Sequence, residues 1–527
     1  MSRRDAEAGR KAPAIALRQL ADPQGSAVAE YAHWIGRRRA WRCQRYAPRP
    51  NGPRFSILTL LYNTPPERLA ACAKSVAAQT YADWEWIVLD NGSTNGCAQY
   101  LVSLVGDDRR VSVIRSDVNK GITAGLYAAL QKSAGDYVVV LDHDDTLYDD
   151  ALAVLAWYIM EHPWVDLVYS DEDKSAQGRR FCPFIKPEYS PALLQSTGYV
   201  CHVVAWGRWL LQQCEVYSDP TVEGAQDWDV ALRAHDAGAR ALRVPEVLYT
   251  WHCGPGSTAG THGAKPYALQ GQKRALERSL ERRGLAGQVT VEPHPYFGAP
   301  DGHWLVRADA GWGEAYTLLV APAAGADGRW LAEALQRAQT PWVAYWPPGV
   351  QACSPGWIEH GVTQLVVNRR AVVACGRLVD ARGRLREGQL AFGLDQGLGT
   401  CDWDDDPCEI GYFGLSLSPR NVSAVWHAPW VAKRDPLLEL IRRHPPRAWP
   451  LWLPELCLRL AQADREIVYA PHMTGWVQAA WRPPSVADAD WQRLRQLAGA
   501  VFLRDPYYPA PLSLRQRYWL EPEDDWR

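Results

Sequence analysis

The residues with the clearest chemical meaning are an acidic cluster, Asp142-His143-Asp144-Asp145, which directly follows the apolar segment 137–141. Three carboxylates within four residues repel one another unless cations or hydrogen-bond donors occupy the site. A hard ion such as Mg²⁺ or Mn²⁺ takes one or two protein carboxylates and fills its remaining positions with phosphate oxygens. The cluster therefore predicts a divalent metal site that would neutralise a leaving diphosphate. The alternative is that Asp144 or Asp145 only caps a following helix, 146–159.

A second acidic pair, Asp227 and Asp229, lies in GAQDWDVALRAHDAG, where the apolar spacing predicts the start of an amphipathic helix. Transfer to a hydroxyl acceptor needs one carboxylate to remove the hydroxyl proton as the oxygen attacks. Either aspartate fits that role, and either also fits an N-cap. Further on, His252 in LYTWH fits a metal ligand, a phosphate contact or a structural histidine, and on its own we interpret it as structural.

The elements that must hold these residues alternate along the chain from residue 54 onwards. Apolar and amphipathic runs predict strands at 55–63, 84–90, 111–117 and 136–142, and helices at 66–79 and 122–135. Strands separated by helices of this length indicate βαβ units on a parallel sheet, and so an α/β fold. Ligands bind beyond the carboxyl ends of the strands in such a sheet.

Polar residues stand at each of these predicted strand ends. Tyr62-Asn63 closes the first strand, Asp90 the second and Asp142 the fourth, and Asn119 follows the third. The Asp90 carboxylate suits an N–H group of a base such as uracil or thymine, and the Tyr62 ring suits stacking. Backbone N–H groups in the turn after Asp90 and near Gly121 suit anions. These residues together predict a nucleotide-binding pocket.

The bulk composition narrows the class of protein. A chain of 527 residues predicts two or three domains. A net charge of −2 gives no general attraction to nucleic acid, so none is expected as a partner. The twelve cysteines are scattered with no CxxC pair, which argues against zinc sites and disulfides and favours reduced thiols. Because there is neither a signal peptide nor an apolar run of about 18 residues, we expect a cytoplasmic protein.

The first 53 residues form a basic extension with one predicted helix between residues 28 and 46. Tyr31, Trp34, Ile35 and Trp41 share one face of this helix, and arginines cover much of the rest. Such a helix either lies on an anionic membrane or packs its aromatic residues onto the next domain. We favour packing, and a peripheral contact with the cytosolic face of the inner membrane stays open.

The motifs resemble those of family 2 glycosyltransferases. The blocks that carry the resemblance run in order from about Phe55 to Leu285: the YN after the first strand, QTYADWEWIVLDNGST, NKG, GDYVVVLDHDD, YSDEDK, KPEYS, GAQDWD and VLYTWH…GSTA. The chain looks most similar to members from bacterial O-antigen and surface-polysaccharide assembly. The resemblance implies a Rossmann-like GT-A domain, inversion at the anomeric carbon, a UDP- or dTDP-sugar donor, and a saccharide or lipid-linked glycan acceptor.

The resemblance also implies roles for individual residues. Asp142 and Asp144 would form the DxD motif that holds Mn²⁺ or Mg²⁺, with Asp144 the more direct ligand, and Asp227 would be the general base. The donor pocket would be lined by Tyr62, Asn63, Asp90, Ser93, Asn119, Gly121 and Asp142. Further candidates for the site are Asp145, Asp229, His252 and Lys186.

The second half of the chain reads as a degenerate repeat of the first. PWVAYWPPGVQACSPGW aligns with DYVVVLDHDDTLYDDAL and replaces the first three residues of the acidic cluster by Pro347-Pro348-Gly349. LPELCLRLAQADREIVYAP aligns with DWDVALRAHDAGARALRVP at an offset of 226 residues, which turns Asp227 into Leu453. We therefore expect a non-catalytic scaffold or acceptor-binding domain. The acidic stretch 402–406 is expected to form a solvated loop.

The expected domains are thus 1–53, the basic extension; 54–290, the catalytic GT-A domain; 300–490, the degenerate GT-A-like domain; and 491–527, a C-terminal tail. Two other functions remain open. A nucleotidyltransferase would need a glycine-rich basic loop after the first strand, but that loop is Tyr62-Asn63-Thr64-Pro65-Pro66. A catalytically silent carbohydrate- or nucleotide-sugar-binding protein is disfavoured by the intact acidic motifs.

Overall fold

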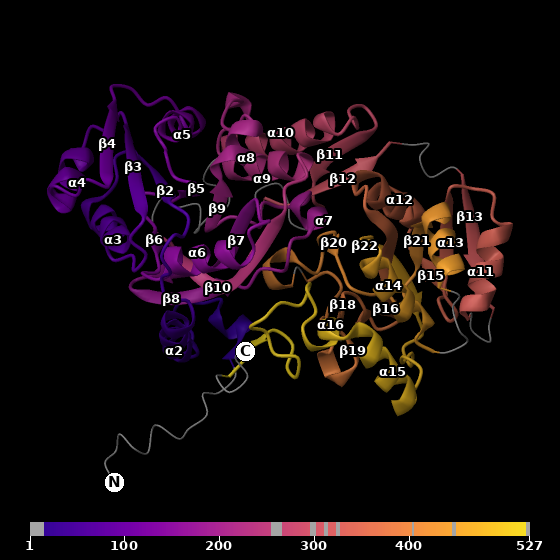
Figure 1. Cartoon of the computed structure of the whole chain (residues 1–527). Helices are drawn as coiled ribbons and strands as arrows, with labels where there is room; N and C mark the ends of the chain where they lie inside the picture. The colour runs from indigo at the N-terminus through magenta and orange to yellow at the C-terminus, as the bar shows by residue number, and fades with distance from the viewer. Residues whose placement is uncertain are drawn as a thin grey trace, which may run out of the picture.

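The computed structural model describes residues 15–254, 266–295, 302–309, 315–322, 327–402, 405–409, 411–444 and 450–522. Two α/β units lie side by side, each on its own mixed β-sheet (Figure 1). In the described part of the chain, no helix combines the length and apolar character needed to cross a membrane. All twelve cysteines are free thiols. The GSTA motif, residues 256–259, lies outside the described residues.

The first sheet has the strand order β4-β3-β2-β5-β9-β7-β10-β6, with β8 paired to β7. Its strands are β2 (Phe55–Leu61), β3 (Trp84–Asn91), β4 (Val111–Ser116), β5 (Tyr137–Val140), β6 (Thr146–Leu147), β7 (Leu167–Ala176), β8 (Arg179–Phe184), β9 (Val204–Gly207) and β10 (Ala241–His252). The four strands predicted from the sequence exist and are mutually parallel. Their carboxyl ends therefore meet at one edge, where ligands bind in sheets of this kind.

Helices follow these strands where the apolar spacing predicts them. They are α3 (Pro66–Ala77), α4 (Cys97–Val105), α5 (Ile122–Leu130), α6 (Ala151–Glu161), α7 (Pro191–Leu194), α8 (Arg208–Gln213), α9 (Gln226–Asp236) and α10 (Pro266–Arg282). Pro66 occupies the first turn of α3, where a missing N–H is harmless. One expectation is wrong: α6 begins at Ala151, because Thr146–Leu147 instead pairs with β10. Asp144 and Asp145 therefore cap no helix.

The N-terminal helix α2 (Val28–Arg45) packs onto the first unit. Tyr31, Trp34 and Ile35 are buried, so its aromatic face points into the protein as we favoured. Two of its arginines are buried as well, although we expected the arginines to lie on the side of the helix that faces away from the protein. Arg42 pairs with Asp150, and Arg38 pairs with Glu246. Strand β1 (Ile15–Ala16) pairs with β23 (Trp519–Leu520), which brings the two ends of the described chain together.

The second sheet has the order β13-β14-β21-β16-β22-β15, with β17 paired to β16. Its strands are β13 (Tyr316–Val320), β14 (Trp342–Trp346), β15 (Ala352–Cys353), β16 (Ala371–Asp380), β17 (Leu385–Glu387), β20 (Arg420–Asn421), β21 (Trp430–Lys433) and β22 (Glu466–Val477). Each neighbouring pair in this order has the same relative direction as its counterpart in β2-β5-β9-β7-β10-β6. Among the described residues, this sheet has no counterpart of β3 and β4.

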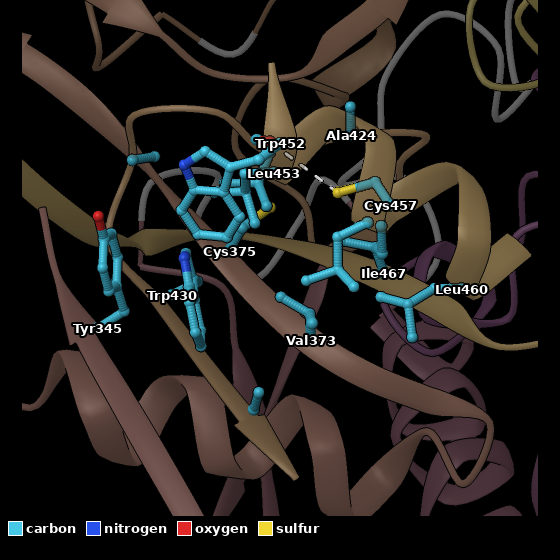
Figure 2. Packing of buried hydrophobic residues seen from close by; sticks show 14 of the residues in the cluster. Tyr345, Val373, Cys375, Ala424, Trp430, Trp452, Leu453, Cys457, Leu460 and Ile467 are labelled. Atoms are coloured by element: carbon cyan, nitrogen blue, oxygen red, sulfur yellow. Dashed lines mark hydrogen bonds between the residues drawn. The ribbon is translucent and has the colours of Figure 1, made fainter. Parts of the chain in front are cut away.

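The helices of the second unit also follow the pattern of the first. They are α11 (Gly328–Arg337), α12 (Trp357–Val367), α13 (Arg434–Arg443), α14 (Trp452–Gln462) and α15 (Asp488–Ala498). Helix α14 presents Leu453 to an apolar core that includes Cys375, Trp430 and Trp452 (Figure 2). Leu453 is 3% exposed. The residue aligned with Asp227 has thus become part of the core.

The two units share an interface built from polar and aromatic contacts. Ser190, the N-cap of α7, hydrogen-bonds Asn421 of β20 at 2.9 Å, and Gln195 donates to Asn368 at 2.8 Å. The Phe413 ring stacks on Phe184 with centroids 4.2 Å apart. The expectation of a solvated acidic loop at 402–406 is only partly correct. Asp405 and Asp406 are exposed, but Asp402 is 3% exposed. Residues 403–404 lie outside the described residues.

Candidate active site

The loops after β2 and β3 interlock at the carboxyl edge of the first sheet. The Ser93 N–H donates to Asp90 Oδ1 at 3.0 Å, and the Ser93 hydroxyl accepts the Asn63 N–H at 3.0 Å. Asn63 Oδ1 in turn accepts the Thr94 N–H at 2.9 Å. Tyr62 stands outside this network with 49% of its surface exposed. The predicted pocket residues Tyr62, Asn63, Asp90 and Ser93 are therefore neighbours.

Asp90 carries a structural signature of a ligand site. It is 1% exposed, yet its Oδ2 atom has no hydrogen-bond partner among the described residues. The nearest cation is Arg115, whose Nε lies 3.9 Å from this oxygen. A buried carboxylate oxygen without a donor is unfavourable, because nothing replaces the water it has lost. The unsatisfied acceptor fits the N–H group of a nucleobase.

Asn119 and Gly121 shape the loop before α5. The Asn119 Oδ1 atom accepts from Asn91 Nδ2 at 3.1 Å and from the Gly121 N–H at 2.8 Å. Glu223 accepts from both the N–H and the hydroxyl of Thr123 at the start of α5. The first-turn N–H groups of α5 are thus partly occupied by a protein carboxylate. Gly121 has φ of +85°, a conformation that side chains rarely adopt.

The acidic cluster divides into exposed and buried members. The side chains of Asp142 and Asp144 are 53% and 37% exposed. Asp145 is buried instead, and it accepts from the Tyr249 hydroxyl and the His252 N–H, both at 2.7 Å. Burial, followed by repulsion from Asp142 and Asp144, raises the pKa of Asp145 well above its usual range. Asp145 is therefore turned away from solvent and anchors the loop.

His252 is also a structural residue. Its Nε2 atom lies 3.2 Å from the Thr146 hydroxyl, and its backbone is tied to Asp145. Burial and the nearby Arg68 and Arg180 lower the pKa of His252 to about 4, so the ring is neutral. This agrees with the structural interpretation of His252.

His202 lies between the acidic cluster 142–145, here called the metal loop, and the predicted general base Asp227. The sequence did not predict a role for His202. Its Nε2 atom is 3.9 Å from Asp142 Oδ2, and its Nδ1 atom is 3.6 Å from Glu172 Oε2. Burial opposes the charged form, but Glu172, Asp142 and Asp227 outweigh it and raise the pKa of His202 to about 9. The imidazole is therefore a cation at neutral pH. No sequence motif marked it, because it lies in the loop before β9.

Lys186 holds the His202 loop in place. Its ammonium group is fully buried and donates to the carbonyl oxygens of Val200, Cys201 and His202 at 3.3, 2.7 and 2.8 Å. Its fourth contact is Glu172 Oε2 at 3.1 Å. Lys186 thus acts on the site through the loop and through Glu172, without facing the donor pocket itself.

The SDED stretch of β7 supplies three buried acids with three separate tasks. Asp171 pairs with Arg243 at 2.6 Å. Glu172 accepts a hydrogen bond from Lys186 and lies beside His202. Asp173 accepts from the hydroxyls of Tyr148, Tyr31 and Thr250 at 2.8, 3.1 and 2.7 Å. The motif YSDEDK signalled this stretch, although its spacing did not show which acid faces the site.

Asp227 and Asp229 differ in their surroundings. Asp229 is 1% exposed and pairs with Arg233 of the next turn at 2.6 Å, which marks it as a structural residue. Among the described residues, no lysine or arginine forms an ion pair with Asp227. Burial raises the pKa of Asp227 to about 6, an effect that His202 opposes and Asp142 reinforces. A carboxylate with this pKa is suited to accept a proton near neutral pH.

The side chains around the acidic cluster offer few metal ligands. In the parts of the chain that the structure describes, no three His, Cys, Asp or Glu side chains converge closely enough to hold a metal by themselves. Asp142 and Asp144 nevertheless suit a hard cation that takes only one or two protein carboxylates and completes its shell with phosphate oxygens. These two residues fit a metal–diphosphate group.

The first unit is similar in sequence to known glycosyltransferases. Residues 56–211 match the family model "Glycosyl transferase family 2". Over these residues the chain is similar to the family 2 glycosyltransferases, and they lie on a mixed α/β fold. The match spans β2 to α8 and so includes Asp90, Asp142 and His202.

Two of the relatives are longer than this chain. An uncharacterized protein, y4gI, of Sinorhizobium fredii is 34% identical over 251 residues, covering 47% of this chain and 28% of the relative. The O-antigen biosynthesis protein RfbC of Myxococcus xanthus is 31% identical over 278 residues, covering 52% and 22%. The chain thus spans about a quarter of the length of each. A crystal structure of S. aureus TarS with UDP-GlcNAc has a TM-score of 0.36 at 17% identity, over 45% of this chain and 74% of that one.

Proposed function

We propose that the chain is a metal-dependent, inverting glycosyltransferase that moves a sugar from a nucleoside-diphosphate sugar to a saccharide or lipid-linked saccharide during surface-polysaccharide assembly. The observation that carries this proposal is the convergence of two unlike carboxylates on His202. Asp142 is exposed and lies 3.9 Å from the imidazole. Asp227 is partly buried, and both His202 and Asp142 are close enough to shift its pKa. The similarity to an O-antigen biosynthesis protein of Myxococcus xanthus supports the biosynthetic setting.

The donor would lie across the carboxyl edge of the first sheet. The unpartnered Oδ2 atom of Asp90 would accept a base N–H, and the exposed Tyr62 ring would stack on the base. These contacts suit uracil or thymine, which supports a UDP- or dTDP-sugar. Asp142 and Asp144 would hold Mn²⁺ or Mg²⁺, which supplies Lewis-acid stabilisation of the leaving diphosphate.

The transfer step follows from the two carboxylates. The acceptor hydroxyl oxygen forms a bond to the anomeric carbon, and its proton passes to Asp227. The bond from that carbon to the diphosphate oxygen breaks, and the electron pair stays with the nucleoside diphosphate. The His202 cation lies beside Asp142 and adds positive charge where that negative charge builds up. Attack opposite the leaving group inverts the anomeric carbon.

The test is donor binding and hydrolysis by the purified full chain, screened over nucleoside-diphosphate sugars with and without Mn²⁺ or Mg²⁺. Asp144→Asn should abolish metal-dependent binding, and Asp227→Asn should keep binding but lose turnover. His143→Gln, between the two metal carboxylates, and Asp229→Asn, on the same helix as Asp227, are matched controls that should keep both. If no donor binds with any metal, the proposal fails and a silent carbohydrate-binding protein takes its place.

A further inference from the structure

The carboxylate of Glu223 joins two segments of the first unit that lie 100 residues apart in the sequence. Its Oε2 atom accepts from the Thr123 N–H at 3.0 Å and from the Thr123 hydroxyl at 2.7 Å. Its Oε1 atom accepts from the Ile122 N–H. One side chain from the loop before α9 therefore satisfies three donors at the start of α5.

Helix α5 has no side-chain cap from its own N-cap residue. That residue is Gly121, which has no side chain to accept a hydrogen bond. Ser, Thr, Asp or Asn at this position usually accepts from the first-turn N–H groups, and a carboxylate there also complements the helix dipole. A cap from a distant loop stabilises the helix as a local one does, and it also fixes where the helix begins relative to that loop.

On one side, the start of α5 is continuous with the predicted donor pocket. The loop 119–121 precedes the helix directly, and Asn91 binds this loop from the end of β3. Asn91 Oδ1 accepts from the Lys120 N–H at 3.0 Å, and Asn91 Nδ2 donates to the Gly121 carbonyl at 2.9 Å. Asn91 is the neighbour of Asp90, which we place against the base. A shift of the first turn of α5 therefore displaces the loop that lines the pocket.

On the other side, Glu223 is tied closely to Asp227, which lies in the first turn of α9. The short connection between them is ordered, because the Ala225 N–H donates to the Val222 carbonyl at 2.8 Å. The backbone also packs against α10: a Cβ atom on Gly271 would come within 2.4 Å of the Glu223 carbonyl oxygen. The backbone of Glu223 is therefore fixed to the helix pair that carries Asp227, while its side chain holds α5.

We propose that Glu223 is a positioning residue that fixes the donor pocket relative to Asp227. It acts through the loop 119–121 on one side and through α9 on the other, without contacting the reacting atoms itself. This role rests on the proposed function, in which the donor lies against that loop and Asp227 receives the proton of the acceptor. The structural coupling between α5 and α9 is independent of that function and is tested separately.

Amide hydrogen exchange of the full chain, measured by mass spectrometry without any ligand, tests the coupling. In Glu223→Ala, exchange should accelerate in residues 121–127 and also at Ala225 and Asp229, whose amides donate to backbone carbonyls at 2.8 and 2.9 Å. Asp327→Ala is the matched control, because the Asp327 carboxylate accepts a backbone N–H at 2.9 Å at the start of α11 in the second unit. It should accelerate neither segment. Faster exchange in 121–127 alone would make Glu223 a simple cap and overturn the coupling.

Transfer at saturating donor tests the positioning role, at a temperature where circular dichroism shows every variant folded. Glu223→Ala should lower kcat about tenfold or more. Glu223→Gln keeps one acceptor oxygen and should give an intermediate kcat. Thr123→Val removes only the hydroxyl contact, so it should cause a smaller loss and add nothing in the Glu223→Ala background.

A purely structural residue would lower the unfolding midpoint and leave kcat unchanged, and that result would overturn the positioning role. If the wild-type chain transfers no sugar, the proposed function fails, and the exchange experiment still decides the coupling between α5 and α9.

Discussion

The ammonium group of Lys186 and the carboxylate of Glu172 form a fully buried ion pair in which Nζ and Oε2 are 3.1 Å apart. Burial alone would raise the pKa of Glu172, but Lys186 and His202 outweigh it and lower the pKa to about 2. Glu172 is therefore ionised at neutral pH, and its depressed pKa stabilises the fold above its usual pKa and ceases to do so as the pH falls through about 2. Lys186 also hydrogen-bonds the backbone of the loop that contains His202. Loss of this ion pair should therefore affect both the stability of the fold and the geometry of the site.

Lys186→Met should destabilise the fold by ~3–5 kcal/mol, because it leaves a buried carboxylate without its cation. Urea unfolding of the full chain measures this. The double variant Lys186→Met/Glu172→Gln should recover part of the lost stability but not the activity, since His202 then loses its charged partner. Arg443→Met removes an exposed helical pair with Glu439 and should change stability by less than ~1 kcal/mol. Equal losses in the buried and exposed variants would contradict the prediction.

The pH dependence of transfer should report Asp227. A general base works only when deprotonated, and the pKa of Asp227 is about 6. Turnover should therefore rise as the pH increases through about 6, with a slope of one proton, and level off above it. The measurement is kcat against pH at saturating donor and metal. Asp229→Asn should leave this acid limb in place, whereas an unchanged limb in the residual activity of Asp227→Asn would assign it to another group.

Much of the proposed donor pocket could be predicted from the sequence, because short sequence patterns mark the residues that form it. An apolar run followed by a polar residue marks both a strand and its carboxyl end, so Asp90, Asn119 and Asp142 were placed correctly on one edge. The same logic overreached at Asp145, which is adjacent to the metal loop in sequence but turns inward to Tyr249. Burial of a single side chain depends on distant strands, and local spacing does not encode it.

Other parts depend on contacts between distant residues. His202 becomes a site residue only because Glu172 and Asp142 face it from β7 and the loop after β5. Asp402 looked solvated because its neighbours are acidic, yet it lies 3.7 Å from the buried Arg420. The offset of 226 predicts a repeat, and the second sheet has the same succession of parallel and antiparallel pairs as six strands of the first. That the second unit is non-catalytic stays a prediction.

Gly121→Ala should weaken donor binding. At φ of +85° a side chain is strained, and its Cβ would come within 2.9 Å of Glu223 Oε1, which holds the start of α5. A strain of ~1–3 kcal/mol that shifts this loop corresponds to roughly a tenfold or larger rise in the donor Kd. Calorimetry with metal present measures it.

Gly96→Ala is the control for that variant, because Gly96 also has a positive φ, +77°, but open space around its Cβ position. It should alter stability slightly and leave the donor Kd within about twofold. The same rise in Kd for both variants would show that the glycine conformation, and not the contact with Glu223, is responsible.

Helix α2 should support the metal loop through Arg42. The Arg42 guanidinium is 0% exposed and binds Asp150 at 2.9 and 3.0 Å and the Val247 carbonyl at 3.0 Å. Arg42→Met strands the buried Asp150 carboxylate and should destabilise the fold by ~3–5 kcal/mol. Because Asp150 follows the acidic cluster closely, amide hydrogen exchange should accelerate together in α2 and in residues 142–150. Arg49→Met, which removes an exposed pair with Glu161 and a cation–π contact with Trp157, should accelerate neither segment. Faster exchange in α2 alone would show that the helix does not stabilise residues 142–150.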